Sequence, residues 1–105
     1  MECISLTLSG LKLIYPKIFP DERGFFLESF QAERYAKEGV EGPFVQDNHS
    51  YSNRGSLRGM HFQSSPEQGK LIRVATGTIF DVAVDLRPQS PTFGKWEGVI
   101  LDSQD

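Results

Sequence analysis

The sequence is poor in cysteine, in basic excess and in long apolar runs, and each shortage excludes a class of protein. The only cysteine, Cys3, cannot form an internal disulfide, so we expect a reducing compartment, the cytoplasm. Residues 1–4 (MECI) lack the charged and apolar regions of a signal peptide, and no apolar run approaches the roughly 20 residues of a membrane span. The lack of such a run leads us to expect no membrane partner, and the net charge of −3, which shows no basic excess, leads us to expect no nucleic-acid partner.

What is present is enough apolar material for one small domain, residues 1–105, because 38% of the 105 residues are hydrophobic and eight are phenylalanine. The one helical stretch is residues 31–38 (QAERYAKE), which ends at Gly39. The remainder consists of short runs of strand-forming residues with turn signals between them, such as residues 20–24 (PDERG). The predicted strands are residues 11–15, 24–30, 44–49, 56–63, 70–75, 78–86 and 96–101.

This order of elements predicts an all-β fold, an antiparallel sandwich or barrel with one short helix near the N-terminus. A jelly roll of two full sheets needs about eight strands beyond any N-terminal arm. The last predicted strand is followed only by residues 102–105 (DSQD), so we expect sheet edges that find no partner in this sequence.

Residues 46–70 hold both histidines of the chain, together with arginine, lysine and amide side chains on predicted strands. In residues 57–63 (LRGMHFQ) a period of two places His61 on one face with Gly59 and Gln63. Gly59 removes bulk beside His61, and histidine is the usual proton-transfer residue near neutral pH. For a lone histidine a structural role would be favoured, but the polar neighbours Arg58 and Lys70 favour chemistry.

The pair His61 and Gln63 has the i, i+2 spacing of a metal-binding His-x-His pair, but glutamine is a poor ligand for transition metals. His49 and Glu67 add no recognised ligand spacing. We therefore expect no metal and no other cofactor.

Three further charged residues, Lys70, Arg23 and Glu28, each have a structural interpretation beside a functional one. Lys70 could stabilise an oxyanion beside a polar pocket, or it could be a solvated strand end. Arg23 and Glu28, on either side of Gly24, could form an ordinary hairpin ion pair.

Two aspartates, Asp81 and Asp85, share one face of a predicted apolar strand. An inward carboxylate needs a partner or water, so this face borders a wet pocket or lies on the outer surface, and the sequence favours neither.

Several runs together resemble the dTDP-4-dehydrorhamnose 3,5-epimerase family of the cupin superfamily. They are residues 21–30 (DERGFFLESF), 44–50 (FVQDNHS), 57–63 (LRGMHFQ), 68–74 (QGKLIRV), 80–87 (FDVAVDLR) and 90–96 (SPTFGKW). They lie in the family's order over most of the chain, which makes the resemblance specific. It implies a metal-free, cupin-type jelly roll, usually a homodimer with exchanged N-terminal strands.

The resemblance also implies roles for individual residues. His61 would remove the protons next to the C4 ketone of a dTDP-4-keto-6-deoxyhexose, and Lys70 would stabilise the enolate oxygen. The nucleotide sugar would be held by Arg23, Glu28, Gln46, Asn48 and Arg58, the arginines being suited to its diphosphate.

Epimerisation also needs an acid on the opposite face of the sugar, which is a tyrosine in this family. Tyr15, Tyr35 and Tyr51 all precede the histidine motif, so none of them occupies that position. We therefore interpret the chain as the N-terminal part of an incomplete cupin-like epimerase domain. The alternatives are a sugar-nucleotide-binding module without catalysis, and a 3- or 5-epimerase of a related dTDP-deoxysugar.

Overall fold

The structure of the chain is a computed structural model that describes residues 1–62 and 69–103. These residues belong to two compact units. One consists of Met1–Gln31 and Ile72–Asp105, and the other of Ala32–Leu71. The elements in chain order are β1 (Glu2–Ser5), β2 (Lys12–Tyr15), β3 (Ile18–Asp21), β4 (Gly24–Leu27), α1 (Ala32–Lys37), β5 (Thr78–Val84) and β6 (Trp96–Asp102).

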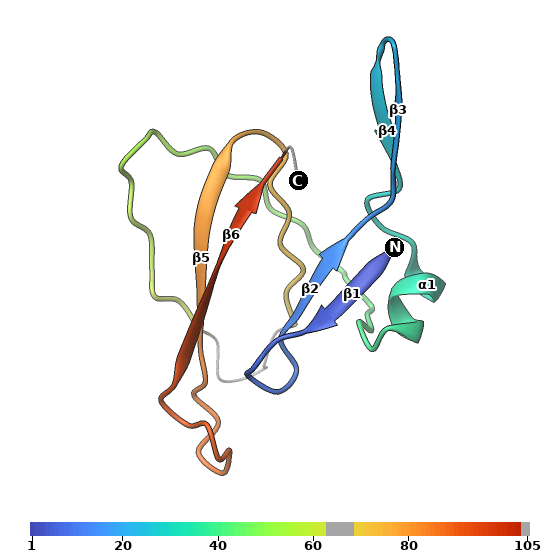
Figure 1. Ribbon diagram of the computed structural model, residues 1–105. Helices are drawn as coiled ribbons and strands as arrows, with labels where there is room; N and C mark the ends of the chain where they lie inside the picture. Colours follow the sequence, from blue (N-terminus) through green and yellow to red (C-terminus); the bar gives the residue numbers. More distant parts are fainter. Residues whose placement is uncertain (63–68, 104–105) are drawn as a thin grey trace. The chain divides into compact units, whose positions relative to one another are not determined.

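All strands of the described chain lie in the first unit, as three antiparallel pairs, β1–β2, β3–β4 and β5–β6 (Figure 1). The β3–β4 hairpin closes with a two-residue turn at Glu22 and Arg23, and Asp21 pairs with Gly24 across it. This turn lies within the predicted residues 20–24, where proline and glycine bracket the chain reversal.

The longest pair is β5–β6, in which Thr78 faces Asp102 and Val84 faces Trp96. Further hydrogen bonds join the two strands at the end that lies away from their connecting loop. There the Thr78 hydroxyl donates to the Asp102 carboxylate, and the Ser103 N–H donates to the Gly77 carbonyl at 3.0 Å. The sequence places β-branched and aromatic residues along both strands, which is typical of strands.

Glu97 of β6 connects this pair to the loop between β1 and β2. One carboxylate oxygen accepts the Leu8 N–H at 3.1 Å and the other accepts the Thr7 N–H at 3.3 Å. Leu8 itself is buried, with 5% of its surface exposed. A single side chain thus holds residues far apart in the sequence within one unit.

In the second unit, α1 ends in a Schellman motif. The Gly39 N–H donates to the Ala36 carbonyl at 2.9 Å, and the Val40 N–H donates to the Tyr35 carbonyl at 2.8 Å. Gly39 has a φ of 83°, a left-handed conformation that suits glycine. Tyr35 of α1 is buried, with 2% of its surface exposed.

The predicted all-β class with one short helix is confirmed, and so are the helix and four strands. The predicted helix 31–38 is α1. The predicted strands 11–15, 24–30, 78–86 and 96–101 correspond to β2, β4, β5 and β6, with β4 ending early at Leu27. The sequence does not predict β1 or β3, and β3 ends with Pro20 and Asp21, which the sequence indicates as the start of a turn.

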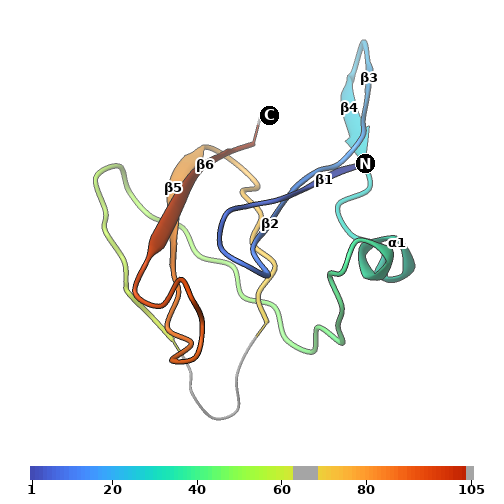
Figure 2. The same ribbon diagram turned by 60° about the horizontal axis from the view of Figure 1, so that its bottom comes forward.

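Three predicted strands are wrong as far as the structure describes them. Residues 44–49, 56–62 and 70–75 contain no strand, and residue 63 lies outside the described residues. The segment from α1 to β5 runs without regular structure wherever it is described, in both views (Figures 1 and 2). Alternation of apolar and polar residues identifies a segment that suits a sheet. The segment becomes a strand only when a neighbouring strand forms backbone hydrogen bonds with it.

The described residues include no helix that is both long and apolar enough to span a membrane.

Candidate active site

Five of the seven predicted site residues lie in the second unit, namely Gln46, Asn48, Arg58, His61 and Lys70. All five are exposed. The structure brings two of them together, since the Gln46 amide nitrogen donates to the Asn48 side-chain oxygen at 3.3 Å. Neutral amides of this kind can donate and accept at once, which suits a base or sugar hydroxyl.

Arg58 is held by the chain just before it. Its Nε donates to the Ser52 hydroxyl at 2.8 Å and its Nη2 donates to the Tyr51 carbonyl at 3.2 Å. A turn lies between Ser52 and Arg58, and it is closed by a hydrogen bond that the Ser56 N–H donates to the Asn53 carbonyl at 3.1 Å. The guanidinium is therefore oriented before any ligand arrives, and its planar fork of five N–H donors suits an anion.

His61 is exposed and follows Gly59, which has a φ of 121°. A side chain at Gly59 would make only an ordinary contact with His61, 3.8 Å from its Nδ1. The backbone conformation is thus a stronger reason for glycine here than the space that the sequence suggested, because residues with a Cβ rarely adopt this φ.

Lys70 lies in a described stretch without regular structure, so the predicted position at a strand start is wrong. Among the described residues, no hydrogen bond or ion pair joins Lys70 to His61. No group of three His, Cys, Asp or Glu side chains in residues 1–62 and 69–103 could hold a metal ion. Gln63 and Glu67, two of the residues considered as metal ligands, lie outside the described residues.

The other two predicted residues belong to the first unit. Arg23 lies in the β3–β4 turn, where its Nη2 forms a 2.7 Å ion pair with Asp21. This ion pair lowers the pKa of Asp21 from its ordinary value. The Arg23 backbone N–H, which donates to the same carboxylate at 2.8 Å, lowers it further. Glu28 directly follows β4 and is exposed.

Aromatic side chains accompany Arg23 on this hairpin, and the sequence motifs did not predict a role for them. The Phe19 and Phe26 ring centroids are 6.4 Å apart, and the Lys17 Nζ lies 5.0 Å from the Phe19 centroid. The signal was available, because Phe19 and Phe26 face each other once the turn is placed at residues 22–23.

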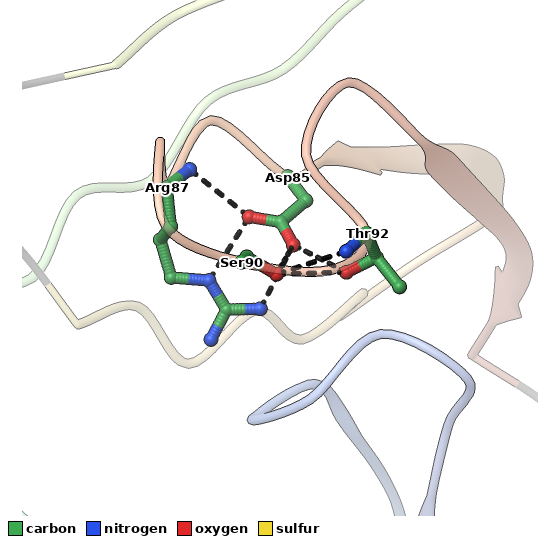
Figure 3. Close-up of polar contacts among 4 residues, drawn as sticks. All are labelled: Asp85, Arg87, Ser90 and Thr92. Carbon is green, nitrogen blue, oxygen red and sulfur yellow. Dashed lines mark hydrogen bonds and ion pairs between the residues drawn. The ribbon is translucent and has the colours of Figure 1, made fainter.

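The structure decides the position of Asp85, which the sequence left open. Its side chain is 1% exposed and lies among the loop residues that follow β5 (Figure 3). Arg87 donates through Nε at 2.9 Å, Ser90 through its hydroxyl at 2.6 Å and Thr92 through its hydroxyl at 2.5 Å. The inward carboxylate therefore has protein partners and does not border a wet pocket.

These donors hold the pKa of Asp85 far below its ordinary value of 3.8, the Arg87 side chain contributing most. The same pair raises the pKa of Arg87. Asp85 thus organises a loop. Asp81, its partner in the sequence pattern, is only half-buried and faces Val99.

Comparison with known proteins identifies the family. The family model of dTDP-4-dehydrorhamnose 3,5-epimerase matches residues 5–105. The dTDP-4-dehydrorhamnose 3,5-epimerase of Methanothermobacter thermautotrophicus is 52% identical over 101 residues, which cover 96% of this chain and 55% of that protein. The epimerase of Neisseria gonorrhoeae is 49% identical over 99% of this chain, which spans 32% of its length.

Solved structures agree. The dTDP-6-deoxy-D-glucose-3,5-epimerase of Legionella pneumophila, in complex with dTDP-4-keto-L-rhamnose, is 56% identical and superposes with a TM-score of 0.93, covering 98% of this chain and 55% of that one. The Bacillus anthracis epimerase, with TDP and pyrophosphate bound, is 48% identical with a TM-score of 0.94, covering 98% of this chain and 60% of that one. The chain therefore shares the predicted jelly-roll fold and belongs to the dTDP-4-dehydrorhamnose 3,5-epimerase family, of whose members it spans about half the length.

Proposed function

We propose that the domain to which this chain belongs epimerises dTDP-4-dehydro-6-deoxy-D-glucose at C3 and C5. The product is dTDP-4-dehydro-L-rhamnose, an intermediate of dTDP-rhamnose biosynthesis. The observation that carries the proposal is the family match over residues 5–105, which includes each proposed site residue. The ligand of the Legionella structure, dTDP-4-keto-L-rhamnose, supports the substrate class.

In this reaction His61 is the base and Lys70 the oxyanion partner. A proton next to a ketone is weakly acidic, so its removal needs both a base and stabilisation of the negative charge that develops on the oxygen. The exposure of both side chains supports the proposal, because each must reach a bound sugar.

The remaining predicted site residues bind the nucleotide part of the substrate and the sugar hydroxyls. We assign the diphosphate to Arg23 and Arg58, whose guanidinium groups form paired hydrogen bonds with phosphate oxygens. Glu28, Gln46 and Asn48 contact the nucleoside or the sugar hydroxyls, for which a carboxylate and two amides supply acceptors and donors.

The acid that returns the proton comes from the part of the family domain that this chain does not span. The described tyrosines do not suit this role. Tyr35 is a buried residue of α1, and Tyr15 and Tyr51 precede the histidine motif in the chain.

The test is proton exchange with deuterated solvent. Residues 1–105 are joined to the part of the Legionella relative that they do not match, and the hybrid is incubated with the 4-keto sugar in D₂O. We expect deuterium at C3 and C5, and a loss of at least about a hundredfold in the exchange rate with His61→Gln, the contribution typical of a positioned general base.

The matched control is His49→Gln, because His49 is the other histidine of the chain and is likewise exposed in the second unit. The control should exchange at the parent rate. Undiminished exchange with His61→Gln would overturn the assignment of the base. Binding of dTDP by the hybrid with no exchange would favour a binding module over an enzyme.

A second candidate is a related sugar as substrate. A 4-keto-6-deoxy sugar epimerase from the novobiocin gene cluster of Streptomyces spheroides is 41% identical, with a TM-score of 0.91. The exchange measurement separates the candidates, since deuterium at C3 alone or C5 alone identifies a one-centre epimerase.

The proposal includes a homodimer with exchanged N-terminal strands and a cytoplasmic location. The single cysteine, Cys3, supports the location because the described chain has no disulfide to preserve. Light scattering during size exclusion of the hybrid tests the dimer, which should have twice the mass of one chain.

A further inference from the structure

Arg58 is held by the preceding chain along one edge of its guanidinium. Its Nε donates to the Ser52 hydroxyl at 2.8 Å, and its Nη2 donates to the Tyr51 carbonyl at 3.2 Å. Nε and Nη2 lie on the same edge of this planar group, because the guanidinium is a rigid fork. The second edge, formed by Nη1 and Nη2, presents two parallel N–H donors, which match two oxygens of a phosphate.

The turn between Ser52 and Arg58 is closed without the help of the arginine. Its backbone hydrogen bond runs from the Ser56 N–H to the Asn53 carbonyl at 3.1 Å. Gly55, at the third position of this turn, has a φ of 86°, which glycine adopts without the cost that a Cβ brings. The contacts of Arg58 are additional to this turn, so their main effect is on the arginine and not on the backbone.

The residues that hold Arg58 lie at the surface. Ser52 and Arg58 are exposed, and Tyr51 is 84% exposed. An exposed arginine samples many rotamers, and a ligand that binds it must fix one of them. The bond from the Ser52 hydroxyl fixes the guanidinium beforehand, so part of this loss of entropy precedes ligand binding.

We propose that Ser52 is a positioning residue for the substrate diphosphate, acting through Arg58. The inference rests on the proposed function, in which Arg58 binds the diphosphate, and it adds that this affinity depends on a hydroxyl that does not itself contact the substrate. The Tyr51 carbonyl assists, but a backbone group is present whatever the side chain at that position. Ser52 is therefore the part of the arrangement that the residue type specifies.

The experiment is a titration of the hybrid protein with dTDP, followed by isothermal titration calorimetry. Ser52→Ala should raise the Kd for dTDP about three- to tenfold, which corresponds to the net contribution of one hydrogen bond. Thymidine has no diphosphate, so its binding, followed by NMR chemical shifts, should be the same in Ser52→Ala and in the parent. Ser52→Thr retains the hydroxyl and should restore the affinity for dTDP.

A double-mutant cycle tests whether Ser52 acts through Arg58. Methionine has no N–H donor, so in the Arg58→Met background Ser52→Ala should change the Kd for dTDP by less than about twofold. The matched control is Ser56→Ala, which removes an exposed hydroxyl from the same turn but keeps the backbone N–H that closes it. This control should bind dTDP as the parent does, and circular dichroism checks that each variant is folded.

An unchanged Kd for dTDP in Ser52→Ala would overturn the inference. An equal rise in the Arg58→Met background would overturn it as well, and so would a parallel loss of thymidine binding, since either result indicates a structural role. A hybrid that binds no dTDP would overturn it together with the assignment of Arg58.

Binding and proton exchange are separate measurements, so the two proposals can fail independently. If Ser52→Ala weakens dTDP binding as expected but the hybrid gives no deuterium exchange, Ser52 is a positioning residue in a binding module and the epimerase proposal fails. If the hybrid exchanges at C3 and C5 while Ser52→Ala leaves the Kd for dTDP unchanged, the epimerase proposal stands and the role of Ser52 is wrong.

Discussion

Asp85 shows how a few local contacts settle a position that a pattern leaves open. A period of two places Asp81 and Asp85 on the same face, yet only Asp85 is buried. The difference lies in the loop after β5, where Arg87, Ser90 and Thr92 return to the carboxylate. Burial of this charge is tolerated because each oxygen accepts hydrogen bonds from the loop.

This network predicts a pH dependence of stability. The folded-state pKa of Asp85 is lowered, so its contribution to the free energy of unfolding is present above the unfolded value of 3.8. As the pH falls below 3.8, Asp85 becomes protonated in the unfolded chain but stays ionised in the folded chain. Proton binding then favours the unfolded state, so the free energy of unfolding declines. Thermal unfolding between about pH 7 and about pH 2 should show this loss.

Asp85→Asn should lower the unfolding temperature at neutral pH and flatten the acid limb, because the titrating group has been removed. Ser90→Ala removes one donor and should give a smaller change in both. If Asp85→Asn kept the parent's full acid dependence, other carboxylates would be responsible for it.

At the scale of elements, the helix is specified by its own residues. Gly39 closes α1 through two hydrogen bonds that depend on a left-handed backbone. The sequence predicted this helix end because glycine is the commonest residue at that position. Local interactions suffice here, so prediction from local sequence succeeds.

Gly39→Ala should therefore destabilise the helical unit by about 1–2 kcal/mol, the cost of a left-handed conformation for a residue with a Cβ. Urea unfolding followed by far-UV circular dichroism measures the change. Gly39→Asn is the matched control and should cost less, because asparagine tolerates this conformation. Equal losses in the two variants would argue against the backbone explanation.

Strands behave differently, because their hydrogen bonds come from elsewhere in the chain. β5 and β6 are seven residues each and find each other across one loop. Residues 44–49 have a similar alternation but no strand partner among the described residues, and Val45 is 89% exposed. Leu57, in the next predicted strand, is 96% exposed.

At the scale of the whole molecule, this difference predicts an uneven distribution of protected amides. In the isolated chain, amides of residues 44–49 and 56–62 should exchange with deuterium at least about tenfold faster than the paired amides of β5 and β6, since exchange protection follows local stability. Mass spectrometry of peptic fragments measures this. Equal protection in residues 44–49 and in β5 would contradict the observed lack of strands.

The sequence by itself determined the family, the helix α1 and the identity of the proposed site residues. It could do so because a motif such as residues 57–63 (LRGMHFQ) carries its chemistry in the residue types, and a helix end depends on near neighbours. The roles of His61, Lys70 and the substrate-binding residues remain proposals.

Only the tertiary structure decided which alternating segments become strands and which carboxylate is buried. Each of these depends on partners distant in the sequence, as Glu97 shows by binding Thr7 and Leu8. A sheet is stabilised by such distant pairs, so a segment's own residues establish that it suits a strand, and its neighbours in space establish that it forms one.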